Sequence, residues 1–301
     1  MHARLEVVRW LFPLLFLLPW AVLTPVFSGG QTAEASQTAQ AILTPAQAQA
    51  LVDRALASEL RAAQDASHPM RYRLRKTSPR LTTTKEILET RDGDVACLVM
   101  LWDKPLSQAD EQVEEARLAA LLNDPGLQRH RKQGEEGDLG IVLKLLRMLP
   151  DAYLYQYEGA GAGSAGRVEK FRFRPNPNFS PPDLETQALK AMTGEIWIDA
   201  AQERVTRLEG HLEQDTDYGW GILGKLDKGG WIVIEQADMG EHAWRIARFQ
   251  MKMNLRILFK TKNIDTAEEM TGYAPLPAGL GYQEAIRLLR AGSGSTAQAG
   301  R

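Results

Sequence analysis

The sequence predicts an α+β fold: a curved antiparallel β-sheet, or half-barrel, with a few helices packed on one face. Apolar and polar residues alternate along many short runs, which is the period of half-buried strands. The runs follow one another through turn signals, and only a few segments show helical spacing. A parallel sheet would need a crossover connection between successive strands, so this meander favours antiparallel pairing.

The composition is that of a globular protein. With 44% hydrophobic and 25% charged residues, the 301-residue chain is not disordered, fibrous or polytopic. Its 36 Lys and Arg residues nearly balance 38 Asp and Glu residues, so the net charge is -2 and no nucleic-acid partner is expected. The single cysteine, Cys97, excludes an internal disulfide and a multi-cysteine metal site, and its apolar neighbours predict that it is buried.

The N-terminal segment has the order of a secretory signal. Two arginines within the first ten residues precede the apolar run Leu11–Phe27, and small residues with A-x-A spacing end at Ala35 and Ala41. We therefore expect residues 1–41 to be a signal peptide and the protein to be exported to the periplasm or cell envelope. The alternative is an uncleaved N-terminal anchor, although the run is short against the roughly 20 apolar residues of a spanning helix.

Two helices are predicted from their starts. A Thr-Pro-Ala-Gln sequence forms a capping box ahead of apolar residues at helical spacing, which predicts a helix over 45–64. Ser107 is the expected cap of a second helix over 108–122. The polar stretch 128–138 is predicted to be loop or frayed helix, and the run IVLKLLRML at 141–149 a short apolar helix.

The chain is expected to form a single domain over 42–290, because it shows no internal repeat and no linker long enough to separate two domains. The helices between residues 108 and 149 read as an insertion into the sheet. A last helix is expected over 282–290, and the Gly- and Ser-rich tail at 291–301 is expected to be disordered.

Strands account for the rest of the domain. Residues 70–75 alternate between apolar and arginine side chains, while 95–101 are apolar on both faces. The glycine-rich segment 159–166 reads as a loop between two strands, and PNPNFSPP at 175–182 as a rigid crossing loop, because proline has no amide donor. A meander of strands continues through the segments 194–200, 203–213, 229–236, 242–249 and 251–260.

A glycine motif resembles a nucleotide-binding loop but lacks the residues and the following helix that such a loop needs. Gly219–Gly224 matches G-x-G-x-x-G, and Lys225 follows it. Leu226 stands where a phosphate-binding loop needs a hydroxyl for magnesium, and Asp-Lys-Gly-Gly follows where a helix should start. We therefore expect a turn between strands and no nucleotide.

No residue pattern identifies a catalytic or metal site. Glu209, His211 and Glu213 share one face of a strand, but a flat strand does not bring them to one ion, so a solvated outer face is the favoured interpretation. No G-x-S-x-G elbow is present, and a spatial Ser/His/Asp arrangement is left open. The protein is accordingly not expected to be an enzyme or to hold a cofactor or a metal.

Two basic runs, 71–76 and 128–132, could touch anionic lipid headgroups, although a solvated face is the favoured interpretation of both. The most suggestive feature is an apolar stripe with flexible methionines on the late strand, which forms either core beneath a helix or a surface that accepts apolar ligands. Together with two inward phenylalanines, the expected ligand-lining residues are Phe171, Phe173, Met251, Met253, Leu255 and Ile257.

The meander resembles the LolA/LolB-type lipoprotein-carrier superfamily, or an uncharacterised exported bacterial family with that fold. The segments that carry the resemblance are GEIWIDAAQERVTRLEG (194–210), GGWIVIEQ (229–236) and MNLRILFK (253–260). The likeness spans roughly residues 44–275 and is one of pattern, so no individual binding residue is carried over. It implies a half-barrel whose helices cover a cleft for acyl chains. The helical insertion and the lack of a lipidation cysteine depart from the family.

These observations predict an exported envelope protein that binds or shuttles a hydrophobic ligand, such as a lipid or the acyl chains of a lipoprotein. Its partners would be that ligand or lipoprotein and, through the basic runs, a membrane surface. The alternative is a non-enzymatic sensor or scaffold that recognises a protein partner, with its cleft filled by its own helices. An exported enzyme is a third reading, without a nominated nucleophile.

Overall fold

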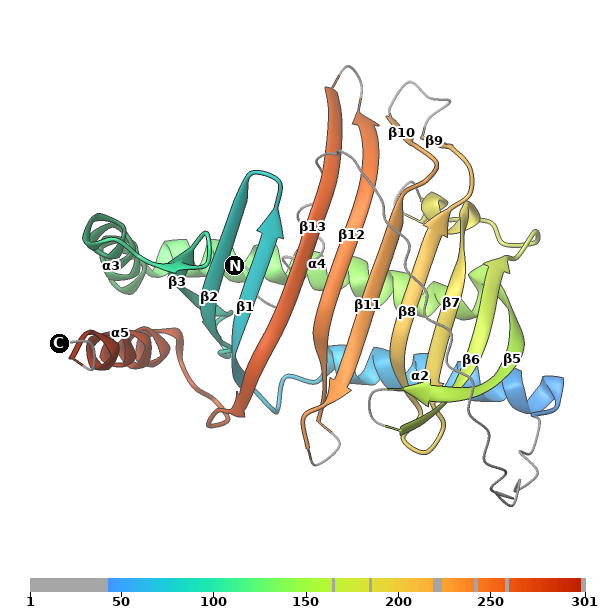
Figure 1. Cartoon of the computed structure of the whole chain (residues 1–301), viewed down its shortest axis with the longest axis horizontal. Helices are drawn as coiled ribbons and strands as arrows, with labels where there is room; N and C mark the ends of the chain where they lie inside the picture. Colours follow the sequence, from blue (N-terminus) through green and yellow to red (C-terminus); the bar gives the residue numbers. More distant parts are fainter. Residues whose placement is uncertain are drawn as a thin grey trace, which may run out of the picture.

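The computed structural model describes residues 43–163, 166–183, 186–218, 224–240, 243–257 and 260–298. The predicted signal peptide at 1–41 lies outside these residues. Within them, thirteen antiparallel strands form one open sheet, which confirms the predicted α+β class (Figure 1). The strands are β1 (Met70–Ser78), β2 (Leu81–Leu88), β3 (Val95–Leu101), β4 (Lys104–Pro105), β5 (Tyr153–Gly163), β6 (Gly166–Pro175), β7 (Met192–Asp199), β8 (Arg204–Leu212), β9 (Thr216–Tyr218), β10 (Gly224–Leu226), β11 (Trp231–Asp238), β12 (Trp244–Ile257) and β13 (Lys260–Pro275).

The sheet joins two meanders at its centre. Its strand order is β4-β3-β2-β1-β13-β12-β11-β8-β7-β6-β5, with the β9–β10 hairpin attached to β12. Neighbours in the first four strands are consecutive along the chain, and the second meander returns to β1 only through its last strand, β13. The β1–β13 pairing, from Met70 opposite Pro275 to Thr77 opposite Ala267, therefore links the two halves of the sheet.

Helices α2 (Pro45–Gln64) and α3 (Gln108–Asn123) begin where their caps predict. The Thr44 side chain accepts a hydrogen bond from the Gln47 amide, and the Gln47 side chain accepts one from the Thr44 amide. α2 then buries one apolar face, including Val52 and Ala55, against the aromatic side of β5 and β6. The capping box thus starts the helix and the apolar stripe fixes it to the sheet.

The polar stretch at 128–138, expected to be loop or frayed helix, is regular helix. It belongs to α4 (Pro125–Ala152), which is continuous with the apolar run at 141–149. The Gln128 side chain donates to the carbonyl of Asp92, and Lys132 donates to the carbonyl of Arg91. These bonds hold the polar half of α4 on the β2–β3 turn, so tertiary hydrogen bonds replace the apolar periodicity that sequence analysis looks for. The basic run at 128–132 serves this contact.

Two other boundaries differ from expectation. The glycine-rich loop predicted at 159–166 is strand on both sides: β5 continues to Gly163 and β6 starts at Gly166. Gly159 has a φ of 111° at the register shift after Tyr157, a conformation that a residue with a Cβ rarely adopts. At the other end of the chain, α5 (Tyr282–Gln298) passes the expected end at residue 290 and enters the predicted tail.

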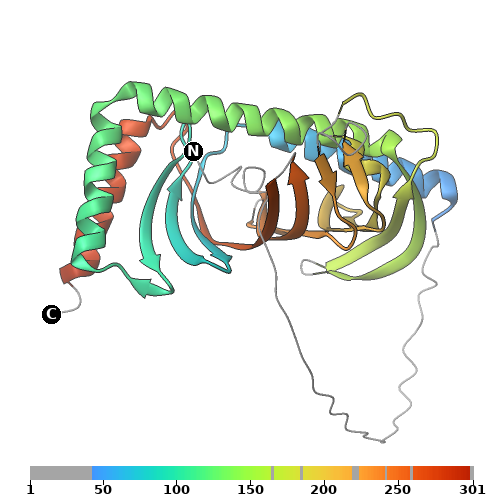
Figure 2. The same cartoon turned by 90° about the horizontal axis from the view of Figure 1, so that it is seen from above.

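The two faces of the sheet carry different helices. We call the face that bears Phe249 and Met251 the inner face; α2 packs on it, and α4 runs along the same side of the molecule (Figure 2). At the other end of the sheet, Leu88 and Val95 contact α3 and α5, whereas their chain neighbours Ile87 and Ala96 belong to an inner-face cluster. Because successive strand residues point to opposite faces, α3 and α5 cover the outer face there. Cys97 is buried beneath them, as expected.

Helix α3 also protects the edge of β3. The Glu114 carboxylate accepts a hydrogen bond from the Leu98 amide at 2.8 Å, and the Arg117 guanidinium donates to the Ala96 carbonyl. Glu114 and Arg117 bond each other as well. Backbone groups that would offer a template for another strand are therefore occupied by side chains.

We expect Glu114→Ala to lower the free energy of unfolding by about 1–3 kcal/mol, because it leaves a buried amide without its acceptor. The freed edge should also increase self-association. Urea unfolding and analytical ultracentrifugation measure the two effects. The control is Glu111→Ala on the exposed side of α3, for which a change within about 0.5 kcal/mol is expected. Equal stability of the two variants would contradict the capping role.

Candidate functional site

The inner face of the central strands is apolar over two adjoining clusters. Cross-strand pairs place Met251 beside Thr266 and Met253 beside Ile264, between β12 and β13. Residues of β8 and β10–β13, with the short helix η1 (Gln187–Lys190), make one cluster, and residues of β1–β3 and β13 make the next. The buried members are Ala191, Leu212, Leu226, Phe249, Met251, Met253 and Ile264 in the first, and Met70, Tyr72, Leu74, Ile87, Ala96 and Met270 in the second.

An ion pair lies between these clusters. Lys76 on β1 is opposite Glu268 on β13, and the Lys76 Nζ is 2.5 Å from Glu268 Oε1. The Lys76 side chain is 14% exposed and that of Glu268 is 0% exposed. Strand alternation sends Arg71 and Arg75 outward, where they pair with Glu86 and Asp103. The basic run at 71–76 is thus an outer face for its arginines, while its lysine belongs to the interior.

Thr266 adds a second polar group to the inner face. It lies two residues before Glu268 on β13, so both side chains are on the same side of the sheet. Thr266 is 6% exposed, and its hydroxyl has no hydrogen-bond partner among the described residues. A buried hydroxyl without a partner costs free energy, which makes this position unusual in an otherwise apolar cluster.

Helix α4 carries an apolar stripe that the core does not absorb. Leu139, Val142, Leu143 and Leu146 have the i, i+3, i+4, i+7 spacing of one helix face. None of the four is buried, and none packs against a core cluster formed by the described residues. The neighbouring residues Leu145, Met148 and Leu149 do pack on the α2 cluster. The last turns of α4 are therefore anchored on the α2 cluster, and the stripe beside them stays half-exposed.

The structure places the expected lining residues in two separate clusters. Phe171 and Phe173 pack beneath α2, while Met251 and Met253 are buried in the cluster of the central strands. Leu255 is partly buried and packs against the same cluster as Met251 and Met253. The side chain of Ile257 lies outside the described residues, although its backbone pairs with Gly224 and Lys260.

Sequence reasoning missed Lys76, Thr266 and Glu268 because each interrupts an apolar alternation with a polar side chain. The alternation Ile264, Thr266, Glu268, Met270 is visible only once the partner strands are known. The apolar run at 141–149 did indicate the α4 stripe. Which side of the helix faces the core could not be assigned from the sequence, because that depends on how α4 lies against the sheet.

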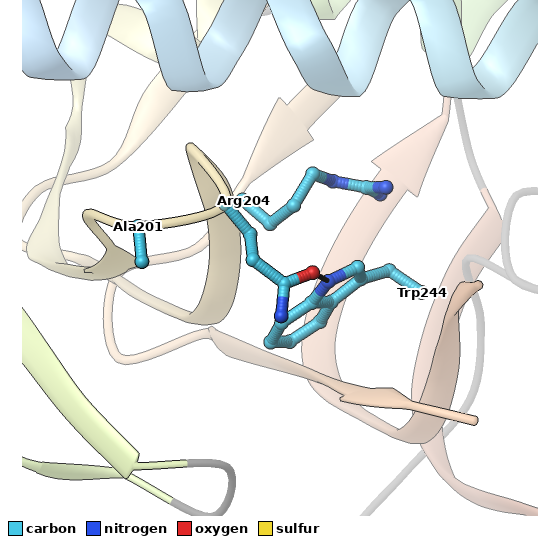
Figure 3. A pocket seen from close by; sticks show the side chains of 4 residues that line it. Ala201, Arg204 and Trp244 are labelled. Carbon is cyan, nitrogen blue, oxygen red and sulfur yellow. Dashed lines mark hydrogen bonds between the residues drawn. The ribbon is translucent and has the colours of Figure 1, made fainter. Parts of the chain in front are cut away.

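A cavity of about 330 Å³ lies beside the starts of the interior strands β8 and β12 and is lined by Ala201, Gln202, Arg204 and Trp244 (Figure 3). Its charged groups are already paired. Glu59 of α2 accepts hydrogen bonds from Arg204 at 2.8 and 3.0 Å and from the Val205 amide at 2.9 Å. The Trp244 indole donates to Gln202 at 2.6 Å. This network fastens the C-terminal part of α2 to the sheet, and the cavity offers no free charge to a ligand.

Tyrosines line the β5 side of the α2 cluster. Burial raises the pKa of Tyr153 and of Tyr155 above the ordinary phenol value. Burial, together with the hydrogen bond that the Tyr157 hydroxyl donates to Glu169 at 2.5 Å, raises the pKa of Tyr157 to about 12. The three phenols therefore stay neutral at physiological pH and act as apolar rings with a polar tip.

The residues first considered as metal ligands form a surface network. Glu209 accepts hydrogen bonds from Arg207 and lies 2.9 Å from the His211 ring nitrogen, and these contacts lower the pKa of Glu209. Glu213 accepts a hydrogen bond from Thr193 instead. Among the described residues no group of three or more His, Cys, Asp or Glu side chains could hold a metal ion.

One Ser/His/Asp trio does occur, at the end of α2. Ser67 Oγ and Asp65 Oδ2 both lie within 2.9 Å of the same nitrogen, His68 Nδ1. In a catalytic triad the serine and the carboxylate contact opposite ring nitrogens. Ser67 also donates to Asp65, and these bonds lower the pKa of Asp65. The trio is an exposed turn that ends the helix.

The glycine motif falls mostly outside the described residues, which omit 219–223. Its last residue, Gly224, begins β10 and pairs with Tyr218 and Ile257. Lys225, the lysine that follows, forms ion pairs with Asp215 at 2.5 Å and with Asp227 at 3.7 Å. Lys225 therefore lies on a strand between two carboxylates.

No protein-family model matches the sequence, and no curated protein matches it. Two solved structures match the chain with low TM-scores. One is a Vibrio parahaemolyticus domain described as an outer membrane lipoprotein-sorting protein domain, with a TM-score of 0.30, 11% identity, and coverage of 76% of this chain and 95% of that one. The other is a DUF1329 family protein from Desulfovibrio piger, with a TM-score of 0.27, 10% identity, and coverage of 78% and 95%. At these values neither likeness bears on function.

None of the helices in the described ranges is both long enough and apolar enough to cross a membrane.

The tyrosine cluster predicts alkaline sensitivity. Because the folded-state pKa of Tyr157 is raised to about 12, from about 10 in the unfolded chain, its stabilising effect is complete below about pH 10 and is lost as the pH rises through 12. We expect the unfolding free energy of Tyr157→Phe to fall less than that of the wild type between about pH 10 and about pH 12. Urea unfolding at alkaline pH and phenolate absorbance measure it. Ionisation of Tyr157 near pH 10 in the folded protein would contradict the prediction.

Proposed function

We propose that this protein is an exported envelope protein that binds or carries a hydrophobic ligand, a lipid or the acyl chains of a lipoprotein, between the inner face of the sheet and α4. The observation that carries the proposal is the α4 stripe. Leu139, Val142, Leu143 and Leu146 stay half-exposed on a helix that runs along the inner side of the sheet (Figure 2). A ligand chain would remove this apolar surface from water.

The two ends of α4 are held by different forces. Near its start, Gln128 and Lys132 bond to backbone carbonyls of the β2–β3 turn. Near its end, Leu145, Met148 and Leu149 pack on the α2 cluster. In the middle, Lys144 forms a partly exposed ion pair with Asp183 at 3.0 Å, which is a weak restraint, so we infer that this part moves while both ends stay in place. Burial of an acyl chain beside it would contribute about 0.8 kcal/mol for each methylene that leaves water.

Glycines weaken the helix at the start of the stripe. A Cβ added at Gly137 or at Gly140 would meet nothing within 4 Å, so close packing does not require glycine at either position. A glycine inside a helix costs about 1 kcal/mol relative to alanine. Weak helical segments next to a binding surface open most readily, which suits a cover that must admit and release a ligand.

Export is the part of the proposal that rests on the sequence. Residues 1–41 would direct the chain across the membrane, and Cys97, which forms no disulfide, tolerates an oxidising compartment because it is buried. The proposed function is binding, because the observation that carries it is a half-exposed apolar surface. The direct test is mass spectrometry of the mature protein exported to a periplasm, comparing the intact complex with its organic extract.

A stoichiometric lipid or acylated peptide is the expected result, and it would name the ligand class. A protein that emerges empty and also rejects an added fluorescent acyl probe would contradict the proposal. That outcome would favour a module that binds a protein partner through loops such as residues 175–182.

The double variant Leu139→Gln, Leu146→Gln is expected to weaken binding of a fluorescent acyl probe by about tenfold or more, because it places amides on the stripe. Glutamine keeps the helix propensity of leucine, and both positions are half-exposed, so the unfolding free energy should change by no more than about 1 kcal/mol. The matched control is Leu127→Gln on the same helix, where the leucine is exposed. If the double variant and Leu127→Gln bound the probe with equal affinity, the assignment of the stripe as the binding surface would be wrong.

Gly137→Ala with Gly140→Ala is expected to stabilise α4 by up to about 2 kcal/mol in total and to slow both uptake and release of the acyl probe. The dissociation constant should change much less than the two rates. Stopped-flow fluorescence measures the rates, and urea unfolding measures the stability. Unchanged rates in the stabilised variant would show that opening of this segment does not control access.

A further inference from the structure

Thr266 is a hydroxyl in a place where the fold itself does not use one. It is 6% exposed, it faces the inner side of the sheet beside Met251, and its hydroxyl has no hydrogen-bond partner among the described residues. Valine would fit the same β-branched shape without the cost of a buried hydroxyl. A group outside the fold that hydrogen-bonds this hydroxyl would offset the cost.

The neighbours of Thr266 define what that group can be. On the same face of β13, Ile264 lies on one side and Glu268 on the other, at the spacing of alternate strand residues. Phe249 lies opposite Glu268 on β12. The nearest charge on this face of β13 is thus a carboxylate that is already paired with Lys76, since Asp265 belongs to the opposite face and pairs with Lys252. An anion placed at Thr266 would meet this carboxylate, and a cation would be buried among apolar side chains without a counter-ion of its own.

We propose that Thr266 binds the polar end of the ligand, and that this end is an uncharged ester, amide or hydroxyl group of an acyl lipid. This inference rests on the proposed function and adds the ligand class to it. The Thr266 Oγ–H donates to the oxygen of that group, while the acyl chain lies along the apolar side chains of β12 and β13. The Lys76–Glu268 pair, with no net charge of its own, disfavours a charged end beside it.

The chain contains a matched control for this position. Thr77 on β1 is opposite Ala267, the residue after Thr266, and therefore lies on the outer face of the same part of the sheet. Its hydroxyl is also buried without a partner among the described residues. Thr77→Val and Thr266→Val make the same chemical change a few residues apart in the fold, on opposite faces.

The test compares three delipidated proteins, wild type, Thr266→Val and Thr77→Val, by displacement of a fluorescent acyl probe. The competitors share a long hydrocarbon chain and differ at its end: methyl oleate, a hydrocarbon of matched length and oleate, each delivered from cyclodextrin. We expect wild type to bind methyl oleate about fivefold more tightly than the hydrocarbon, the value of one net hydrogen bond. Thr266→Val should lose this preference with its hydrocarbon affinity unchanged, and Thr77→Val should keep it.

Each contrary result has its own meaning. If the hydrocarbon binds but wild type shows no preference for the ester, or if Thr266→Val keeps the preference, the assignment of Thr266 is overturned while the proposed function stands. Tighter binding of oleate would place the polar end at the inner-face lysines Lys76 and Lys85 and would also overturn it. If no competitor and no probe binds, the proposed function fails as well. Urea unfolding confirms that both valine variants are folded, since each removes only a hydroxyl.

Discussion

The pairing of β1 with β13 is the interaction on which the rest of the architecture depends. It joins the N-terminal meander to the last strand of the C-terminal one, over a register that runs from Met70 to Thr77. Without it each meander would have an open edge in the middle of the molecule. The same register places Lys76 opposite Glu268, so the pairing that completes the sheet also creates its buried ion pair.

The second constraint is the mixed character of α4. A helix held by apolar packing along its whole length would close the inner face permanently. Here the first half is held by hydrogen bonds to a turn, and the last turns are held by packing on α2. The apolar stripe between these anchors remains half-exposed. Under the proposed function, a helix held mainly at its two ends would serve as a movable cover.

Two polar side chains near the inner face differ in whether the fold satisfies their hydrogen bonds. Glu59 accepts several hydrogen bonds and is satisfied within the fold, so it fastens α2 to the sheet. Thr266 is buried, but its hydroxyl has no partner among the described residues. The two residues illustrate opposite uses of a buried polar atom: one completes the structure, and the other is left for an interaction that the structure does not supply.

Local signals in the sequence predicted the elements that form through local forces. The capping box at Thr44 located the start of α2, and strand alternation located β1 and the β6–β8 meander. The polar half of α4 was expected to be loop or frayed helix because its helix is stabilised by contacts with residues 91–94, more than thirty positions away in the chain. The strands at 159–163 were missed because glycines there tolerate a bulge that only the partner strand reveals.

The sequence by itself determined the class of the fold, the antiparallel pairing of its strands and the capped helix at 45–64, because hydrophobic period and capping act within a few residues. It also indicated which side chains are apolar enough to be covered. Only the tertiary structure decided that Phe171 and Met251 belong to different clusters, that Lys76 meets Glu268, and that Thr266 is buried without a described partner. These facts depend on strand register and helix placement, which are set by contacts between distant parts of the chain.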